Sequence, residues 1–146
     1  ERIEAFAVDG QGSLYLTGLR LWRDHKYFLI LKYNPQGVLM WEYSDQEQDC
    51  VASAIAVSAA GDSWVGGSCI GAYASRARLL KMSSNGRRLW EKTYDGAGRH
   101  YVTGLQVDFS RNASMAIQVA PDNAYRNGFL TKTVVYDEFG HQVAEY

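Results

Sequence analysis

The residues best suited to chemistry in this sequence are aromatic–arginine combinations that recur along the chain. Trp and Tyr rings offer flat surface for stacking, and guanidinium groups offer several hydrogen-bond donors, so both are favoured anchors at interfaces. The chain contains three copies of a sequence repeat, described below, and each copy is predicted to hold four strands. Each combination falls in the connection between the second and third of these strands, and this connection is predicted to be long in every repeat. The candidate binding residues are Trp22, Arg23, His25, Tyr73, Arg76, Tyr125 and Arg126.

These loop residues predict recognition of a protein, a peptide or a glycan. Loops held on a rigid scaffold often carry function, because the scaffold fixes their position while their sequence is free to vary. The alternative is that the loops tolerate such residues and pack them against their own sheet.

Other residue types form no catalytic or metal-binding pattern. The histidines His25, His100 and His141 fall at different points of the repeat, so they do not converge as a zinc site requires. Ser63 follows Gly and Asp, but Val65 stands where a nucleophile elbow needs its second glycine. We therefore expect a protein that is not an enzyme, with no catalytic residue, no metal and no cofactor.

The two cysteines, Cys50 and Cys69, flank a predicted hairpin in the second repeat. Folding this hairpin brings them directly opposite in one register and a residue or two apart in others. A disulfide requires Cα atoms within about 7 Å, so pairing depends on the register. A disulfide would indicate an oxidising compartment, and the alternative is two unpaired buried thiols.

The elements that must position these residues come from an internal repeat. A strand–turn–strand motif at 7–18 returns around Val57 and, in a weaker form, around Val107. Val8 and Val57 are 49 positions apart, and Val57 and Val107 are 50 apart. Self-similarity at such a period is typical of repeat architectures.

Each repeat holds four segments that are rich in β-branched and aromatic residues and bounded by Gly, Asn, Asp and Ser. The predicted strands are 3–8, 13–17, 27–33, 38–43, 52–57, 62–66, 76–82, 87–92, 102–107, 112–117, 129–136 and 141–146. No segment shows the sustained helical periodicity of a capped helix. The sequence therefore predicts an all-β fold in a single domain, 1–146.

The first strand of each repeat carries small residues at one position, namely Ala5, Ala54 and Gly104. Small residues suit strands that converge on a central axis, where space is tightest. Four strands in a repeat of about 40–50 residues are typical of β-propellers. The predicted architecture is β-propeller-like, with three four-stranded antiparallel blades at about 1–49, 50–99 and 100–146.

The motif Val-Asp-x-x-Gly-x-x-Tyr-x-x-Gly, which begins at Val8, resembles bacterial propeller repeats of the SBBP type. The motif Asn-Pro-x-Gly-x-x-x-Trp, which begins at Asn34, is similar to their turn between the third and fourth strands. Quinoprotein-like propellers have a related Gly-x-x-x-Trp ending. The third repeat departs from both motifs at Arg111, Ser114 and Ala144. The resemblance implies a propeller fold and favours a periplasmic or cell-surface location, but it implies no activity.

Three blades do not close a ring, and their outer faces would remain apolar and exposed. The absent initiator Met and the boundaries of the repeats favour a segment of a longer protein. Further blades would then come from the same chain, or else from other copies. A flat or sandwich-like all-β domain is the remaining alternative.

The predicted function is a non-catalytic binding or scaffolding module. The alternatives are a fragment of a larger quinoprotein-like propeller enzyme and a structural surface repeat array. A net charge of −1 argues against nucleic acid as a partner. The apolar runs are too short to predict a membrane span.

Overall fold

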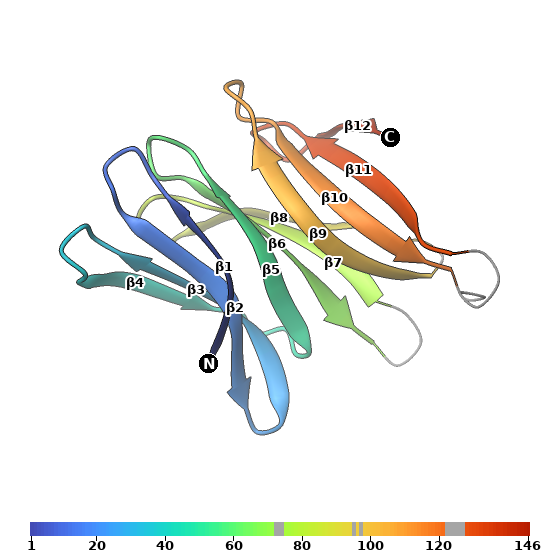
Figure 1. Ribbon diagram of the computed structural model, residues 1–146, viewed down its shortest axis with the longest axis horizontal. Helices are drawn as coiled ribbons and strands as arrows, with labels where there is room; N and C mark the ends of the chain where they lie inside the picture. Colours follow the sequence, from blue (N-terminus) through green and yellow to red (C-terminus); the bar gives the residue numbers. More distant parts are fainter. Residues whose placement is uncertain (72–74, 95, 97, 122–127) are drawn as a thin grey trace.

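The computed structural model describes residues 1–71, 75–94, 96, 98–121 and 128–146 (Figure 1). Within these ranges the chain is all-β, as predicted, and it contains no helix, so none that is long and apolar enough to cross a membrane. The strands are β1 (Arg2–Val8), β2 (Leu14–Trp22), β3 (His25–Tyr33), β4 (Leu39–Ser44), β5 (Cys50–Val57), β6 (Ser63–Ile70), β7 (Ser75–Met82), β8 (Arg88–Tyr94), β9 (Arg99–Val107), β10 (Ala113–Ala120), β11 (Leu130–Tyr136) and β12 (Gln142–Glu145).

Consecutive strands pair antiparallel in three strand groups, β1–β4, β5–β8 and β9–β12. The second and third groups touch through one parallel residue pair, Ser75 with Arg99, and so count as one eight-stranded sheet. Figure 1 shows β5 between β1 and β9, and β5 contacts both. The sheets are open in the part of the chain described, so the closed propeller and its blades stay a prediction.

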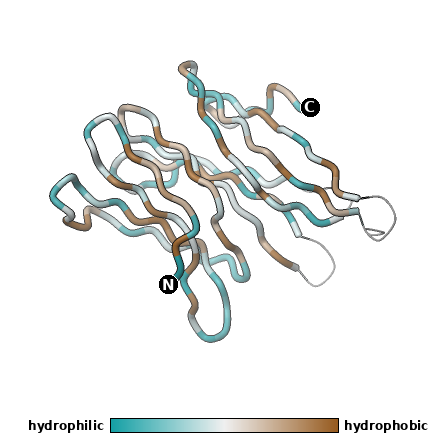
Figure 2. The backbone as a smooth tube through the Cα atoms, viewed as in Figure 1, coloured by the Kyte–Doolittle hydropathy of each residue, from teal (hydrophilic) through white to brown (hydrophobic). Residues whose placement is uncertain are grey.

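Two hydrophobic clusters join the strand groups. The first places Phe28 and Ile30 of β3 against Leu80 and Met82 of β7. The second places Leu79 of the same strand, on its opposite face, among residues of β9–β11. Apolar and polar residues alternate along most strands (Figure 2), but β7 is buried on both faces because a strand group covers each of them.

Six hairpin turns share one capping interaction. In each turn the first side chain accepts a hydrogen bond from the backbone N–H four positions later. Asp, Asn and Ser suit this position because their short polar side chains reach the local backbone. The six residues are Asp9, Asn34, Ser58, Ser83, Asp108 and Asp137.

We predict that the capping aspartates make the stability of the fold depend on acid pH. Burial acts to raise the pKa of Asp9, but hydrogen bonds from backbone amides lower it below its usual value. The Asn112 amide lowers the pKa of Asp108 in the same way. A depressed folded-state pKa contributes stability above the unfolded value of about 3.9, and this contribution is lost as the pH falls through the folded value.

Urea unfolding between about pH 2.5 and pH 6 measures this dependence. In the double variant Asp9→Asn, Asp108→Asn, each side chain keeps one acceptor oxygen for its turn, as Asn34 does in its own turn. Neither asparagine titrates. We expect the free energy of unfolding of this variant to decline less steeply than that of the native protein below about pH 4, because aspartate in the unfolded chain has a pKa of about 3.9. An unchanged slope would show that these two carboxylates do not control the acid response.

Candidate ligand-binding site

The connection between β2 and β3 is a two-residue turn. Trp22 ends β2, His25 begins β3, and the two residues pair across the hairpin. Arg23 and Asp24 between them have φ values of 48° and 65°, as a type I′ hairpin turn requires. The prediction of a long loop in every repeat is wrong here, because the outer halves of β2 and β3 continue the ladder.

The corresponding connections in the other groups are 71–74 and 121–129. Tyr73, Tyr125 and Arg126 lie outside the described residues, whereas Arg76 is the second residue of β7. The β2–β3 turn and the ends of β6 and β10 lie along one side of the molecule, the lower side in Figure 1. Among the described candidates, Trp22 and Arg23 lie together.

Trp22 presents its ring at this edge with 56% of the residue exposed. The Arg23 guanidinium carbon lies 4.4 Å from the centroid of the ring, within the range of a cation–π interaction. The Tyr27 ring lies 6.5 Å away at a tilt of 57°. These neighbours hold the indole in place at the end of a paired strand, so it is an ordered apolar surface.

A pocket of about 440 Å³ opens beside this indole. Its lining residues are Arg20, Trp22, Tyr27, Ser44, Asp45 and Gln46. They come from β2, β3 and the end of β4 with the connection that follows. The pocket is a shallow depression that is open to solvent, and its aromatic wall with a few polar groups is a composition found in ligand sites.

Both charged groups that line the pocket already have partners. Arg20 forms ion pairs with Glu42 at 2.7 Å and with Glu1 at 2.5 Å. The hydrogen bonds to Glu42 and Glu1 raise the pKa of Arg20, and those from Arg20 lower the pKa of Glu42. Asp45 pairs with Arg78 at 2.7 Å. The pocket therefore offers little uncompensated charge to a ligand.

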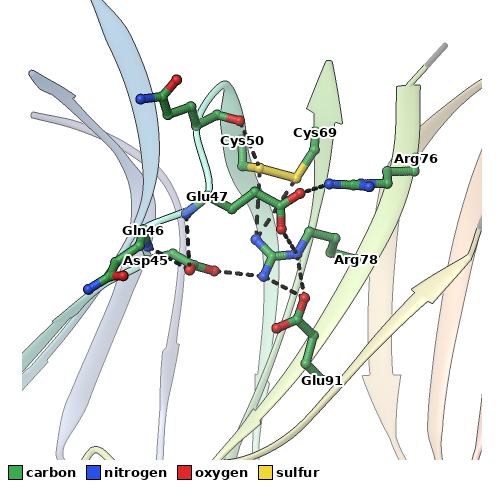
Figure 3. Close-up of a disulfide and its surroundings, with 9 residues drawn as sticks. Asp45, Gln46, Glu47, Cys50, Cys69, Arg76, Arg78 and Glu91 are labelled. Atoms are coloured by element: carbon green, nitrogen blue, oxygen red, sulfur yellow. Dashed lines mark hydrogen bonds and ion pairs between the residues drawn. A yellow bond between two sulfur atoms is a disulfide. The ribbon is translucent and has the colours of Figure 1, made fainter. Parts of the chain in front are cut away.

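Arg78 is the centre of a buried ion cluster beside the pocket (Figure 3). Its side chain is 1% exposed and also meets Glu91 at 2.6 Å and Glu47 at 3.4 Å. The outer arginines Arg76 and Arg88 pair with Glu47 and Glu91 in turn. Three carboxylates thus balance three guanidinium groups, which is how a buried charge becomes tolerable.

The cluster fixes the connection between the first two strand groups. Asp45 and Glu47 belong to the segment that links β4 to β5, whereas Arg78 and Glu91 belong to β7 and β8. Arg76, predicted as a ligand-binding residue, pairs with Glu47, and its binding role stays a prediction. His25 lies 3.3 Å from Asp49 in the same connection and does not line the pocket.

Cys50 and Cys69 are joined by a disulfide next to this cluster, with their Cα atoms 4.0 Å apart. They stand directly opposite in the β5–β6 ladder, which is one of the registers considered from the sequence. Arg78 Nη1 lies 3.8 Å from Sγ of Cys50. The sulfurs and the Glu47 carboxylate lie within 4.8 Å of one another, but disulfide sulfurs have no thiolate to give a metal. We assign this arrangement a structural role.

Sequence reasoning identified Trp22 and missed most of the pocket. Arg20 and Tyr27 face each other across the hairpin, a pairing that would follow from recognising the two-residue turn. No sequence motif marks Ser44 and Gln46 as site residues. They reach the pocket only because β4 pairs with β3.

Compared with known proteins, the chain matches no protein-family model, and no curated protein is significantly similar to it. The resemblance to SBBP-type repeats therefore rests on the motifs in the sequence.

We predict that Arg78→Met destabilises the fold strongly. The change removes the central cation and leaves the buried Asp45 carboxylate without a partner cation, a loss of about 3–5 kcal/mol in the free energy of unfolding. Urea denaturation measures it. The matched control is Arg88→Met, which removes a cation that is 44% exposed and is expected to cost under about 1 kcal/mol. Equal losses in the two variants would contradict a central role for Arg78.

We predict that removing the disulfide lowers stability by about 3 kcal/mol, because it frees a loop with a sequence separation of 19. The double variant Cys50→Ala, Cys69→Ala should unfold at lower urea concentration than the native protein. A reducing agent should destabilise the native protein and leave the variant unaffected. Two reactive thiols per chain in the unreduced folded protein would show that the bond does not form.

Proposed function

We propose that this protein is a non-catalytic binding module whose ligand site is the pocket beside Trp22. The observation that carries the proposal is the exposed indole, which is ordered by Arg23 and Tyr27 and borders a pocket of about 440 Å³. Large exposed aromatic groups in fixed positions are favoured contact points, because little conformational entropy is lost when a ligand stacks on them.

The ligand class that fits this pocket best is a neutral glycan. Arg20 and Asp45 are already paired with protein charges, so an ionic ligand would have to compete with them. The remaining chemistry is aromatic surface, the Ser44 hydroxyl and the Gln46 amide. A sugar ring offers an apolar face for stacking and hydroxyl groups that both donate and accept hydrogen bonds. A peptide or protein segment is the less favoured ligand.

The scaffold that presents this site is, in our proposal, a partial β-propeller of three blades related to the SBBP-type repeats. The antiparallel pairing within each strand group and the position of β5 between β1 and β9 support it. The disulfide supports an extracytoplasmic location, because such bonds persist in oxidising compartments. A cofactor absorbance in the purified protein would favour the quinoprotein-like alternative, and assembly into sheets or fibres would favour a surface array.

We predict that Trp22→Ala weakens glycan binding at least tenfold, which corresponds to about 1.4 kcal/mol. The probes are neutral oligosaccharides, first screened on an array and then titrated by calorimetry. The matched control is Phe139→Ala, which removes a ring that is 70% exposed in the β11–β12 turn and does not line the pocket beside Trp22.

The control should bind as the native protein does, and both variants should keep the native melting temperature. Unchanged affinity in Trp22→Ala would rule out the pocket as the binding site. Absence of binding to every oligosaccharide would rule out the ligand class.

A further inference from the structure

The joint between the first two strand groups uses a row of three side chains. Tyr15, Lys32 and Trp41 are paired across β2, β3 and β4. Lys32 Nζ and Trp41 Nε1 both donate to the Ser84 carbonyl, at 3.0 and 2.9 Å. Lys32 Nζ also lies 5.0 Å from the centre of the Tyr15 ring. Two donors from one group thus converge on one backbone oxygen in the turn between β7 and β8.

The joint between the second and third groups repeats this arrangement. Trp64, Lys81 and Trp90 form the matching row across β6, β7 and β8. Lys81 Nζ and Trp90 Nε1 both donate to the Glu138 carbonyl at 2.9 Å. Lys81 Nζ lies 5.0 Å from the Trp64 ring. Because the same contacts recur at both joints, we interpret the row as the feature that docks one strand group on the next.

The tryptophan of each row also covers a turn glycine. Gly86 and Gly140 have φ of 86°, and each turn closes with an N–H of that glycine donating to the first turn residue. A Cβ added to Gly86 would lie 2.7 Å from Trp41, and one added to Gly140 would lie 3.1 Å from Trp90. Each turn thus presents two features to the row of the neighbouring group. One is a backbone carbonyl that accepts two hydrogen bonds, and the other is a glycine that the indole covers.

The β1–β4 group carries the same acceptor without a donor. Its turn closes in the same way, with Gly37 N–H donating to Asn34 O at 2.9 Å, and Gly37 has φ of 80°. The Pro35 carbonyl stands where Ser84 and Glu138 stand in the other turns. No described side chain donates to it, and a Cβ added to Gly37 would meet no atom within 4 Å.

On the face of the sheet that points away from the second strand group, the apolar side chains of β1 are exposed. Phe6 and Val8 of β1 are 70% and 55% exposed, whereas Ile55 and Val57, their counterparts in β5, are half-buried at the first joint. The exposed face therefore has the composition of a joint surface on which no strand group is packed. Soluble proteins rarely leave such an apolar face uncovered.

The opposite end of the stack differs in a way that identifies the missing partner. The equivalent row in the third group is Ser114, Val135 and Ala144, paired across β10, β11 and β12. These residues lack both the ammonium and the indole donors. A second copy of the chain therefore has no free Lys–Trp row at this end to place on the Pro35 turn.

We propose that the exposed face of β1–β4 docks a further four-stranded unit of the same repeat, one that carries its own lysine and tryptophan row. In the docked state these two side chains donate to the Pro35 carbonyl, and the indole covers Gly37. The inference rests on the proposed repeat scaffold and names the partner that this scaffold takes at its open face.

The test adds such a unit to the complete chain. A copy of residues 1–49 is fused before Glu1, which keeps the spacing of the repeat. We expect a monomer that melts about 5 °C higher, as a gain of one to two kcal/mol would give. The matched control carries Lys32→Met and Trp41→Ala in the added copy only, and it should lose at least half of this gain.

Equal melting temperatures for the fusion, its control and the unfused chain would overturn the proposal. So would light scattering that shows the unfused chain as a stable dimer with little binding of an apolar dye, because a second copy would then cover the face. Oligosaccharide binding is measured in the unfused chain, because Arg20 and Trp22 lie on the same face of the sheet as Phe6, and an added unit would dock on that face. A stabilised fusion, together with an unfused chain that binds no sugar, would refute the proposed function and leave the docking proposal standing.

Discussion

The need to cover both faces of each four-stranded group is the constraint on which the rest of this structure depends. Phe28 and Ile30 on one group require Leu80 and Met82 on the next, and β7 is buried on both faces because a group lies on each side. Apolar packing has no preferred direction, so it does not by itself fix how two sheets align. The paired lysine and tryptophan donors supply that direction, because both must reach one turn carbonyl.

Stacking also determines what lies at the edge where we place the ligand. Once the groups are aligned, the segment from Asp45 to Cys50 must cross from one to the next. The cluster around Arg78 and the disulfide fix this segment at both ends. The end of β4 is thereby held beside the β2–β3 hairpin, which lets Ser44 and Gln46 share a pocket with Trp22. The binding surface is a consequence of the joint and not of a separate motif.

Much of the fold could be predicted from the sequence, because alternation and turn chemistry are local signals. The twelve strands follow from them. The short turn at Arg23 and Asp24 was missed, because residues other than glycine rarely adopt positive φ. The burial of Arg78 was missed as well, since its partners Asp45 and Glu91 are distant in the chain. The tryptophan of the repeated turn motif was visible in the sequence, but its acceptor lies in the next repeat, which only the packed structure identifies.

The most direct test of this account is the exchange rate of the indole protons, measured by nuclear magnetic resonance on the isotopically labelled chain. Trp41 and Trp90 donate to turn carbonyls across the two joints, whereas Trp22 is exposed at the edge. The account predicts slow exchange for the first two and near-solvent exchange for Trp22. Exchange at Trp41 and Trp90 as fast as at Trp22 would contradict it, because the strand groups would then not be docked through these rows.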